Sequence, residues 1–336
     1  MKKQSFFCLT SLLLAVVIGL LLFQTPAIAG KIKLNYASFT PAPTFPSVQM
    51  ERWKIEVEKR TNGQVMINTF PGGTLLGAKG MMDGIIAGQA DIGTLCMAYQ
   101  PGRFMVTNAT SLPLGIKDGK AGCLTLLKLY EKYQPKEFED VVVLTMYTNA
   151  PGNVMSKTPV RNLDDIKGMD LRASGGAAHI LEAWGANPVG MPMPSTVEAL
   201  QKGTVNGLFS SLEVMKDFKF AEYCKFVTMT ETALYPFAAV MNKAKWNSLP
   251  KDVQKVMMDL KEEHSLWVGT YMDEQIKKAI AWSKETNNVE FISLSAGEKA
   301  KWDEKLEFIT ENWIKKANEN GLPGEDIIKD IKAFAQ

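Results

Sequence analysis

Short runs of alternating apolar and polar residues are separated by helix-length segments along the first third of the chain. Asn62 and Gly63 mark the end of the first helical segment, for which Ser47 is a suitable N-cap. The pattern predicts strands at residues 32–38, 64–70 and 90–95 and helices at residues 48–61 and 79–88. Because strands and helices alternate, we expect a twisted, largely parallel sheet.

A second series of strands and helices begins at residue 141. Asn162 and Asp165 have the spacing of a capping box, at a helical turn that Gly168 ends. The series predicts strands at residues 141–147, 154–156, 169–172, 188–193, 204–209, 226–230 and 236–241 and helices at residues 177–184 and 195–202.

The last third of the chain is mostly helical. Apolar residues recur with a 3.6-residue period over residues 250–285, and further helices are expected at residues 296–317 and 325–334. A helix as long as the first of these can connect two domains.

The amino terminus has the pattern of a secretion signal. Two lysines precede an apolar run over residues 12–23, and Ala27-Ile-Ala29 has the small-x-small form of a cleavage site. We predict that residues 1–29 are a signal peptide cleaved after Ala29. The apolar run is short for a membrane span of about 20 residues, so an uncleaved anchor is the lesser alternative.

Charge and cysteine content narrow the function classes. The chain has 38 basic and 36 acidic residues, and removal of the two signal-peptide lysines leaves 36 of each. This balance argues against a nucleic-acid partner. The cysteines that remain, Cys96, Cys123 and Cys224, permit at most one disulfide and lack a metal-ligand spacing, so we expect them to be buried as small apolar residues.

The sequence does not support a catalytic site. The two histidines, His179 and His264, fall inside predicted helices without a partner at ligand spacing. Gly72 and Gly77 have the spacing that opens a phosphate loop, but Ala-Lys-Gly at residues 78–80 replaces the required Lys-Ser/Thr. No Gly-x-Ser-x-Gly elbow is present. We therefore expect a binding protein without a cofactor or a metal.

Arg172 is the most informative single residue. It ends a predicted buried strand just before a glycine turn. A guanidinium is planar and permanently charged, so it can hold a carboxylate by two parallel hydrogen bonds. The residue alone leaves two readings open, an anionic ligand or a structural ion pair with a neighbour such as Asp170.

Four sequence blocks, in this order, carry a family resemblance. They are Phe-Pro-Gly-Gly-Thr-Leu-Leu-Gly at residues 70–77, Lys-Thr-Pro-Val-Arg-Asn-Leu-Asp-Asp-Ile-Lys-Gly-Met-Asp-Leu-Arg at 157–172, Glu-Ala-Leu-Gln-Lys-Gly-Thr-Val-Asn-Gly at 198–207 and Met-Asn-Lys-Ala-Lys-Trp-Asn-Ser-Leu-Pro at 241–250. Together they resemble the dicarboxylate-binding (DctP) family, the solute-binding proteins of tripartite ATP-independent periplasmic (TRAP) transporters. The resemblance covers essentially the whole mature chain.

The resemblance implies an α/β fold of the two-domain periplasmic-binding-protein type. Twisted mixed sheets, a cleft between the domains that closes on ligand, and a long helix that spans both domains belong to this fold. The expected first domain comprises residues 30–148 plus about 238–280, and the expected second domain comprises residues 149–237 plus about 281–336.

The family's binding residues carry over only in part. Arg172 matches the arginine that clamps the ligand carboxylate in this family. Phe209 and Ser210, after the turn at residues 205–207, stand where other branches have an acid and an asparagine or tryptophan. Gly152 stands where one branch has a second arginine. The resemblance therefore implies one clamped carboxylate and no metal.

The other candidate lining residues are mostly apolar. They are Phe39, Cys96, Met97, Asn153, Met193 and Tyr235, with Phe237 as an alternative to Tyr235. Acidic sugars need many polar partners, because each buried unpaired hydroxyl costs about 1–3 kcal/mol. We therefore predict a monocarboxylate ligand with an apolar, aromatic or keto- or hydroxy-substituted body.

The resemblance implies that a periplasmic protein delivers this ligand to a small and a large integral membrane subunit. Nothing in the sequence demands a dimer, so we expect a monomer. Two other functions stay open at this point. A periplasmic ligand sensor for a sensor kinase would share the same sequence features, and a secreted enzyme on the same scaffold would need a nucleophile or an acid/base pair in the cleft.

Overall fold

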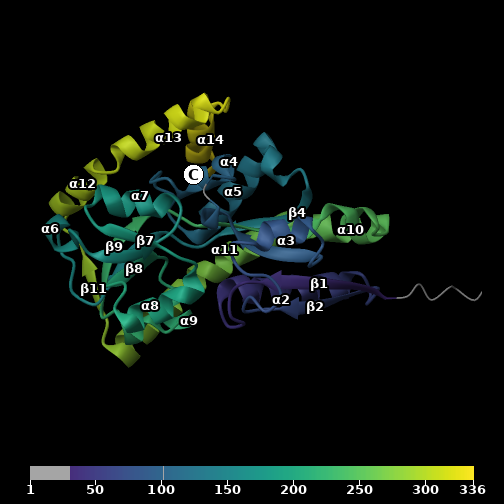
Figure 1. Ribbon diagram of the computed structural model, residues 1–336, viewed down its shortest axis with the longest axis horizontal. Helices are drawn as coiled ribbons and strands as arrows, with labels where there is room; N and C mark the ends of the chain where they lie inside the picture. Colours follow the sequence, from purple (N-terminus) through teal and green to yellow (C-terminus); the bar gives the residue numbers. More distant parts are fainter. Residues whose placement is uncertain (1–30, 101) are drawn as a thin grey trace, which may run out of the picture. The chain divides into compact units, whose positions relative to one another are not determined.

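Two mixed sheets organise the chain in the computed structural model, which describes residues 31–100 and 102–336 (Figure 1). Residues 33–336 form one compact unit. The predicted signal peptide and its cleavage site lie outside the described residues.

The first sheet has the strand order β2-β1-β3-β10-β4. Its strands are β1 (Ile32–Ser38), β2 (Val65–Phe70), β3 (Ile92–Cys96), β4 (Val141–Thr148) and β10 (Pro236–Asn242). β1 and β3 are parallel, but β10 runs antiparallel to both β3 and β4. β1, β3 and β4 therefore run in one direction, as expected for a largely parallel sheet, but the sheet is mixed because β10, from far along the chain, lies between β3 and β4 in the opposite direction.

The second sheet has the order β11-β9-β5-β8-β6-β7. Its strands are β5 (Gly152–Ser156), β6 (Asp170–Ala173), β7 (Asn187–Gly190), β8 (Gly207–Ser210), β9 (Phe226–Thr232) and β11 (Glu290–Ser293). β6 is parallel to β7 and β8, and β5 is antiparallel to β8 and β9. The predicted strand at residues 188–193 is shorter, because a 3-10 turn, η4 (Met193–Ser195), begins after Pro192.

The chain passes between the sheets three times, after β4, before β10 and again between β10 and β11. The first two crossings lie near the domain boundaries expected at residues 148 and 238. The assignment of the helices to two separate domains stays a prediction.

Four short helices adjoin strands of the second sheet along the chain, and a fifth directly follows β10 of the first sheet. They are α6 (Leu163–Ile166), α7 (Gly176–Ala183), α8 (Thr196–Lys202), α9 (Val214–Asp217) and α10 (Lys243–Asn247). The capping box at the start of α6 is confirmed, since Asn162 Oδ1 accepts from the Asp165 amide and the Asp165 carboxylate accepts from the Asn162 amide.

The helices beside the first sheet are α2 (Phe45–Arg60), α3 (Met81–Ile86), α4 (Met105–Asn108) and α5 (Gly119–Tyr133). The predicted cap of α2 is wrong, because the helix begins at Phe45 and Pro46 occupies its first turn. Ser47 instead turns inward, and its hydroxyl lies 3.0 Å from the hydroxyls of both Ser38 and Thr40.

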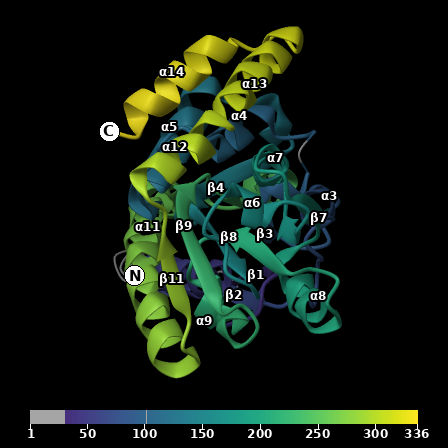
Figure 2. The same ribbon diagram turned by 90° about the vertical axis from the view of Figure 1, so that its left-hand side faces the viewer.

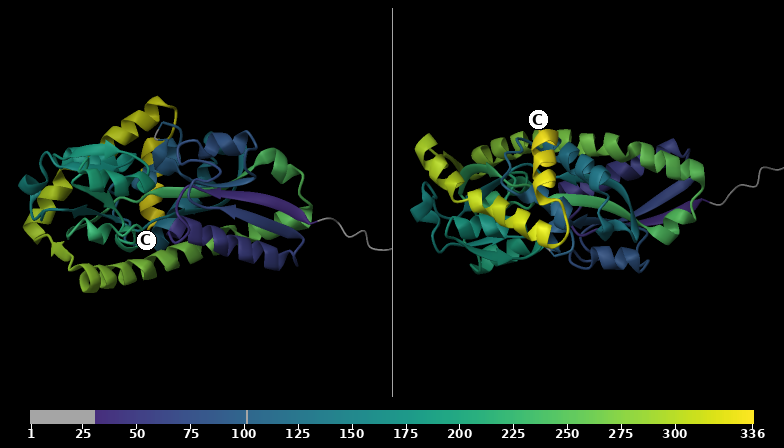
Figure 3. Two further views of the ribbon diagram at one scale, coloured as in Figure 1. Left: turned by 60° about the horizontal axis from the view of Figure 1, so that its bottom comes forward. Right: turned by 90° about the horizontal axis from the view of Figure 1, so that it is seen from above.

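The long helix predicted near residues 250–285 is confirmed as α11 (Lys251–Asn287). It packs against β4 of the first sheet, against α5 beside that sheet and against α9 beside the second sheet. Figure 3 shows α11 running past both sheets. One continuous helix thus braces the two halves of the fold.

The carboxyl-terminal helices return from the second sheet toward the first (Figure 2). They are α12 (Ala296–Glu304), α13 (Glu307–Glu319) and α14 (Gly324–Phe334). α12 packs on α6 and α14 packs on α5. The single helix expected over residues 296–317 is therefore interrupted, by a short turn at residues 305–306.

The hydrophobic core extends from the first sheet into the second. Met146 and Phe237 of the first sheet belong to the same buried cluster as Phe209 and Trp184. A separate cluster around Leu208 packs beneath α8 and α9. The region where the sheets meet is consequently well packed, except at the cavity described below.

His264 of α11 contributes a pH-dependent term to stability. Its Nε2 lies 3.0 Å from Gln49 Oε1, and burial lowers the pKa of His264 to about 3, with the nearby Arg52 charge adding to the shift. The unfolded chain, with a histidine pKa near 6.5, therefore gains a proton that the folded protein does not gain as the pH falls from about 6.5 toward 3.

We expect this difference to destabilise the protein in acid by roughly 2 kcal/mol between pH 7 and pH 5. The His264→Gln variant should lack this part of the pH dependence. Urea unfolding of both proteins at the two pH values measures the difference. Equal losses of unfolding free energy in the two proteins would show that His264 titrates normally.

Candidate functional site

Arg172 lies near the carboxyl end of β6, the strand next to the edge strand β7 of the second sheet. In β6 it pairs with Val189 of β7 and Leu208 of β8, and it is only 1% exposed. Gly175 follows with a φ of 58°, in the left-handed region that favours glycine. The strand therefore holds the guanidinium inside the protein just before the chain turns into α7.

Only neutral groups contact the guanidinium of Arg172. Nε and Nη2 donate to the carbonyl oxygen of Met191 at 3.0 and 2.9 Å, and Nη2 lies 3.3 Å from Ser174 Oγ and 3.4 Å from Tyr99 Oη. The guanidinium carbon lies 5.7 Å from the centre of the Tyr235 ring. Nη1 is buried and has no hydrogen-bond partner.

The described part of the chain places no carboxylate within ion-pair distance of Arg172. Asp170, the alternative partner, is exposed, and its Oδ1 accepts a hydrogen bond from Asn187 at 3.2 Å. A buried cation without a counterion is costly, so the open position at Nη1 favours an anionic ligand.

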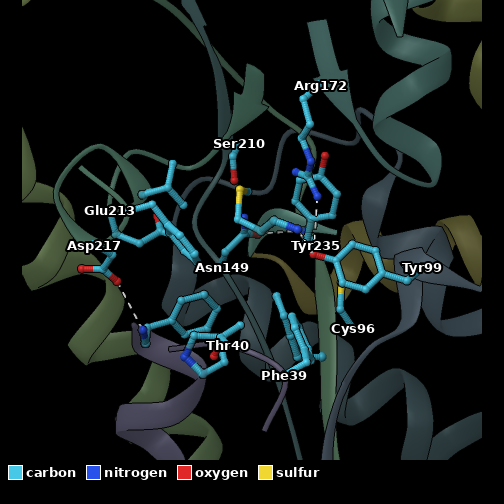
Figure 4. A pocket seen from close by; sticks show the side chains of 16 residues that line it. Phe39, Thr40, Cys96, Tyr99, Asn149, Arg172, Ser210, Glu213, Asp217 and Tyr235 are labelled. Carbon is cyan, nitrogen blue, oxygen red and sulfur yellow. Dashed lines mark hydrogen bonds between the residues drawn. The ribbon is translucent and has the colours of Figure 1, made fainter. Parts of the chain in front are cut away.

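A cavity of about 30 Å³ lies beside Arg172 (Figure 4). Both sheets, α2 and α9 contribute to its wall, which consists of Phe39, Thr40, Phe45, Pro46, Cys96, Tyr99, Asn149, Arg172, Met193, Ser210, Glu213, Val214, Asp217, Phe218, Tyr235 and Phe237. A water molecule needs roughly 10–15 Å³, so this volume holds about two waters. An organic acid requires the wall residues to move apart.

Six of the nine residues predicted from the sequence line this cavity. They are Phe39, Cys96, Arg172, Met193, Ser210 and Tyr235, and the alternative Phe237 lines it as well. They come from segments as distant as residue 39 and residue 237, so the fold brings them together.

The structure places Phe209, Met97 and Asn153 outside the cavity wall. Met97 is fully buried, with its sulfur 3.1 Å from Thr107 Oγ1. Asn153 Oδ1 accepts hydrogen bonds from the Thr230 and Glu231 amides at 2.9 and 3.1 Å, so it holds the start of β5 against the end of β9.

The side chain of Phe209 accounts for the glycine at position 152. It alternates away from Ser210 along β8 and lies beside Trp184, with ring centres 6.0 Å apart. A Cβ atom on Gly152 would lie 2.4 Å from the Phe209 ring. No second arginine can therefore occupy position 152 without displacing Phe209.

Tyr99 is a cavity residue that sequence reasoning missed. It lies in η1 (Met97–Tyr99), directly after β3, and its hydroxyl accepts from the Met193 amide at 3.0 Å. Its ring packs edge-on against Phe39 at 5.5 Å. Burial raises the pKa of Tyr99, so its hydroxyl stays protonated and joins the end of β3 to the second sheet.

Two acidic residues, Glu213 and Asp217, also line the cavity, which corrects the expectation of a mostly apolar wall. Burial raises the pKa of Glu213 to about 8 and the pKa of Asp217 to about 6. Asp217 Oδ2 accepts a hydrogen bond from the Phe45 amide at 3.2 Å, at the start of α2. The only sequence feature that could have pointed to them as cavity residues is that they follow Ser210 by three and seven residues.

The remaining chemistry-bearing residues lie apart from this arrangement or are unreactive. Cys96, Cys123 and Cys224 are all free and buried. His179 is exposed beside Glu182, with Nδ1 3.1 Å from its Oε2. Residues 31–100 and 102–336 contain no group of three or more His, Cys, Asp or Glu side chains placed to hold a metal ion, and none of their helices is long and apolar enough to cross a membrane.

A two-sheet α/β fold with a buried arginine that lacks a counterion, beside a cavity between the sheets, is suited to a protein that binds an anionic solute. The chain belongs to the bacterial extracellular solute-binding protein family 7 (DctP), whose family model matches residues 37–316. The resemblance found in the four sequence blocks is thereby confirmed, as is the fold that it implied.

Three similar proteins illustrate the relationship. The C4-dicarboxylate-binding periplasmic protein DctP of Rhodobacter capsulatus is 26% identical over 316 residues, which cover 89% of this chain and 92% of the relative. A TRAP periplasmic solute-binding protein from Desulfovibrio salexigens, solved as an open complex, is 51% identical with a TM-score of 0.82 over 91% of this chain and 96% of that one. A marine metagenome TRAP solute-binding protein specific for aromatic acids, in complex with 3-hydroxybenzoate, is 28% identical with a TM-score of 0.86. The match covers 91% of this chain and 98% of that one.

Proposed function

We propose that this protein captures a small monocarboxylate with an aromatic or other apolar body outside the cytoplasm and delivers it to the membrane subunits of a TRAP transporter. The buried Nη1 of Arg172, which has no partner and lies on the cavity wall, is the observation that carries the proposal. A ligand carboxylate would supply the missing acceptor and the missing counterion.

The composition of the wall supports an apolar ligand body. Phe39, Tyr99, Tyr235 and Phe237 place aromatic rings around the cavity. The Asp217 carboxylate stays largely ionised near neutral pH, so its negative charge would repel a second carboxylate group on the ligand. One relative, a marine metagenome protein solved with 3-hydroxybenzoate and, as a triple surface mutant, with metahydroxyphenylacetate, is 28–29% identical and agrees with this ligand class.

We propose that ligand binding accompanies closure of the cavity. Hydrogen bonds from the Met193 amide and from Arg172 Nη2 to Tyr99, and from the Phe45 amide to Asp217, join residues on opposite sides of it. Opening breaks these bonds, and closure over a ligand restores those to the Met193 and Phe45 amides around a larger volume. The ligand shifts the equilibrium by its preference for the closed form.

Binding without chemistry is the proposed mode of action. The one thiol on the wall, Cys96, is fully buried, and burial raises its pKa to about 12. It is therefore a protonated thiol and a poor nucleophile at neutral pH. Membership of a solute-binding family supports the same conclusion.

The location and the partners follow from the family and from the amino-terminal pattern. We propose a periplasmic monomer, released by cleavage after Ala29, that docks on a small and a large integral membrane subunit.

A ligand screen by thermal unfolding tests this function. We expect benzoate and 3-hydroxybenzoate to raise the melting temperature, since a ligand at 100 times its Kd adds about 2.7 kcal/mol of stability. Benzamide, which has the same ring without the charge, should have no effect. Stabilisation by succinate or glucuronate alone would overturn the monocarboxylate assignment.

A further inference from the structure

Glu213 is the second polar group on the cavity wall without a partner. It is 1% exposed, it lines the same cavity as Arg172, and its Oε2 is buried without a hydrogen-bond partner. None of the ion pairs among the described residues includes it. Figure 4 shows Glu213 and Arg172 on different sides of the cavity.

The fold gives this carboxyl group no other evident role. It lies three residues after β8, in the turn that leads into α9, where the neighbouring Asp217 caps the start of α2. A buried carboxyl group that served only the fold would be expected to have its oxygens bonded, because each unpaired one carries a desolvation cost. Glu213 leaves one oxygen free at the cavity.

We infer that Glu213 hydrogen-bonds a hydroxyl group of the ligand and makes the protein selective for hydroxy-substituted monocarboxylates over their unsubstituted parent acids. Arg172 and Glu213 would then hold the carboxylate and the hydroxyl at separate points of one ligand body. This inference rests on the proposed function, because it assigns a second contact in the same site.

The protonation state of Glu213 fits a hydroxyl group. Burial raises its pKa to about 8; the neighbouring Ser211 hydroxyl reduces this shift and the charge of Asp217 adds to it, so the group is mostly neutral at pH 7. A neutral carboxyl group can donate one hydrogen bond and can also accept one. It therefore matches a hydroxyl group, which does both as well. An unsubstituted ligand leaves Oε2 unpaired in a closed site, and sites of this kind discriminate strongly against such analogues.

Two variants separate this role from its alternatives. Glu213→Met keeps an unbranched side chain of similar length without hydrogen-bonding groups. Glu213→Gln keeps one donor and one acceptor without a titratable group. Calorimetry at pH 7 with benzoate and with 2-, 3- and 4-hydroxybenzoate gives the preference of each protein for its best hydroxy isomer.

We expect the wild-type protein to bind its best hydroxy isomer about tenfold or more tightly than benzoate. Glu213→Gln should keep most of this preference, and Glu213→Met should lose it. A cooperative urea unfolding transition shows that each variant is folded. A full preference in Glu213→Met, or no preference in the wild-type protein, would overturn the inference.

The outcomes also separate this inference from the proposed function. If the wild-type protein binds neither benzoate nor any hydroxybenzoate, the proposed ligand class fails. If both bind and the Met variant keeps the preference, only the role of Glu213 fails. Tightest binding of a zwitterion such as 3-aminomethylbenzoate, lost in both variants, would show that Glu213 binds as an anion and would overturn the hydroxyl assignment.

Discussion

The Arg172→Lys variant should bind its organic acid about 100-fold more weakly than the wild-type protein, as expected for loss of a buried charge-assisted pair. A lysine keeps the positive charge but cannot form two parallel hydrogen bonds to a carboxylate. It also cannot make both bonds to the Met191 carbonyl that now orient the guanidinium. Isothermal titration with the acid that gives the largest thermal stabilisation measures the loss.

Arg161→Lys is a matched control for this experiment. Arg161 is also an arginine near the second sheet, but its side chain is 53% exposed and pairs with Glu290 at the surface. Exposed pairs contribute about 0–1 kcal/mol, so the control should bind and unfold like the wild-type protein. Unchanged affinity in Arg172→Lys would contradict the carboxylate clamp.

Arg172 could be found from the sequence because its signal is local. A buried strand that ends in an arginine before a glycine turn is visible in neighbouring residues, and the structure has both features. What the sequence left open was its partner. Residues two apart in a strand face the same side of the sheet, so the choice between a ligand and Asp170 depends on how deeply each side chain is buried, and only the structure shows Asp170 exposed.

Tyr99, Glu213 and Asp217 could not be placed from local patterns. Tyr99 faces the cavity because a 3-10 turn reverses the chain after β3, whereas strand alternation stops predicting direction at Cys96. Asp217 lies near the cavity because it caps a helix 172 residues earlier in the chain. Contacts of this length leave no trace in the hydrophobic pattern of either segment.

The elements of the fold could likewise be predicted where their signal is local, and not where they depend on distant residues. Strands and the long helix have periodic signals, and α11 follows its prediction closely at both ends. The antiparallel insertion of β10 and the start of α2 depend on distant chain segments. α5 was not assigned from the sequence, although Asp118 caps it by accepting from the Ala121 amide, so here a local signal was overlooked.

Gly207 shows how backbone spacing positions the binding site. It lies in β8, within the strand predicted at residues 204–209, between Ser156 of β5 and Leu171 of β6. A Cβ atom there would lie 2.1 Å from the Met155 carbonyl oxygen and 2.9 Å from the Ser156 Cα. Both atoms are backbone, so no side-chain rotation can make room.

The Gly207→Ala variant should therefore lose about 3 kcal/mol or more of unfolding free energy, because the substitution forces β5 and β8 apart. Gly190→Ala is the control, since Gly190 lies in the edge strand β7 and a Cβ atom there meets nothing within 4 Å. Urea unfolding should place the control within about 0.5 kcal/mol of the wild-type protein. Because Leu208 pairs directly with Arg172, any Gly207→Ala protein that folds should also bind its ligand more weakly. A Gly207→Ala protein with wild-type stability and affinity would show that the sheet tolerates a wider strand spacing at this point.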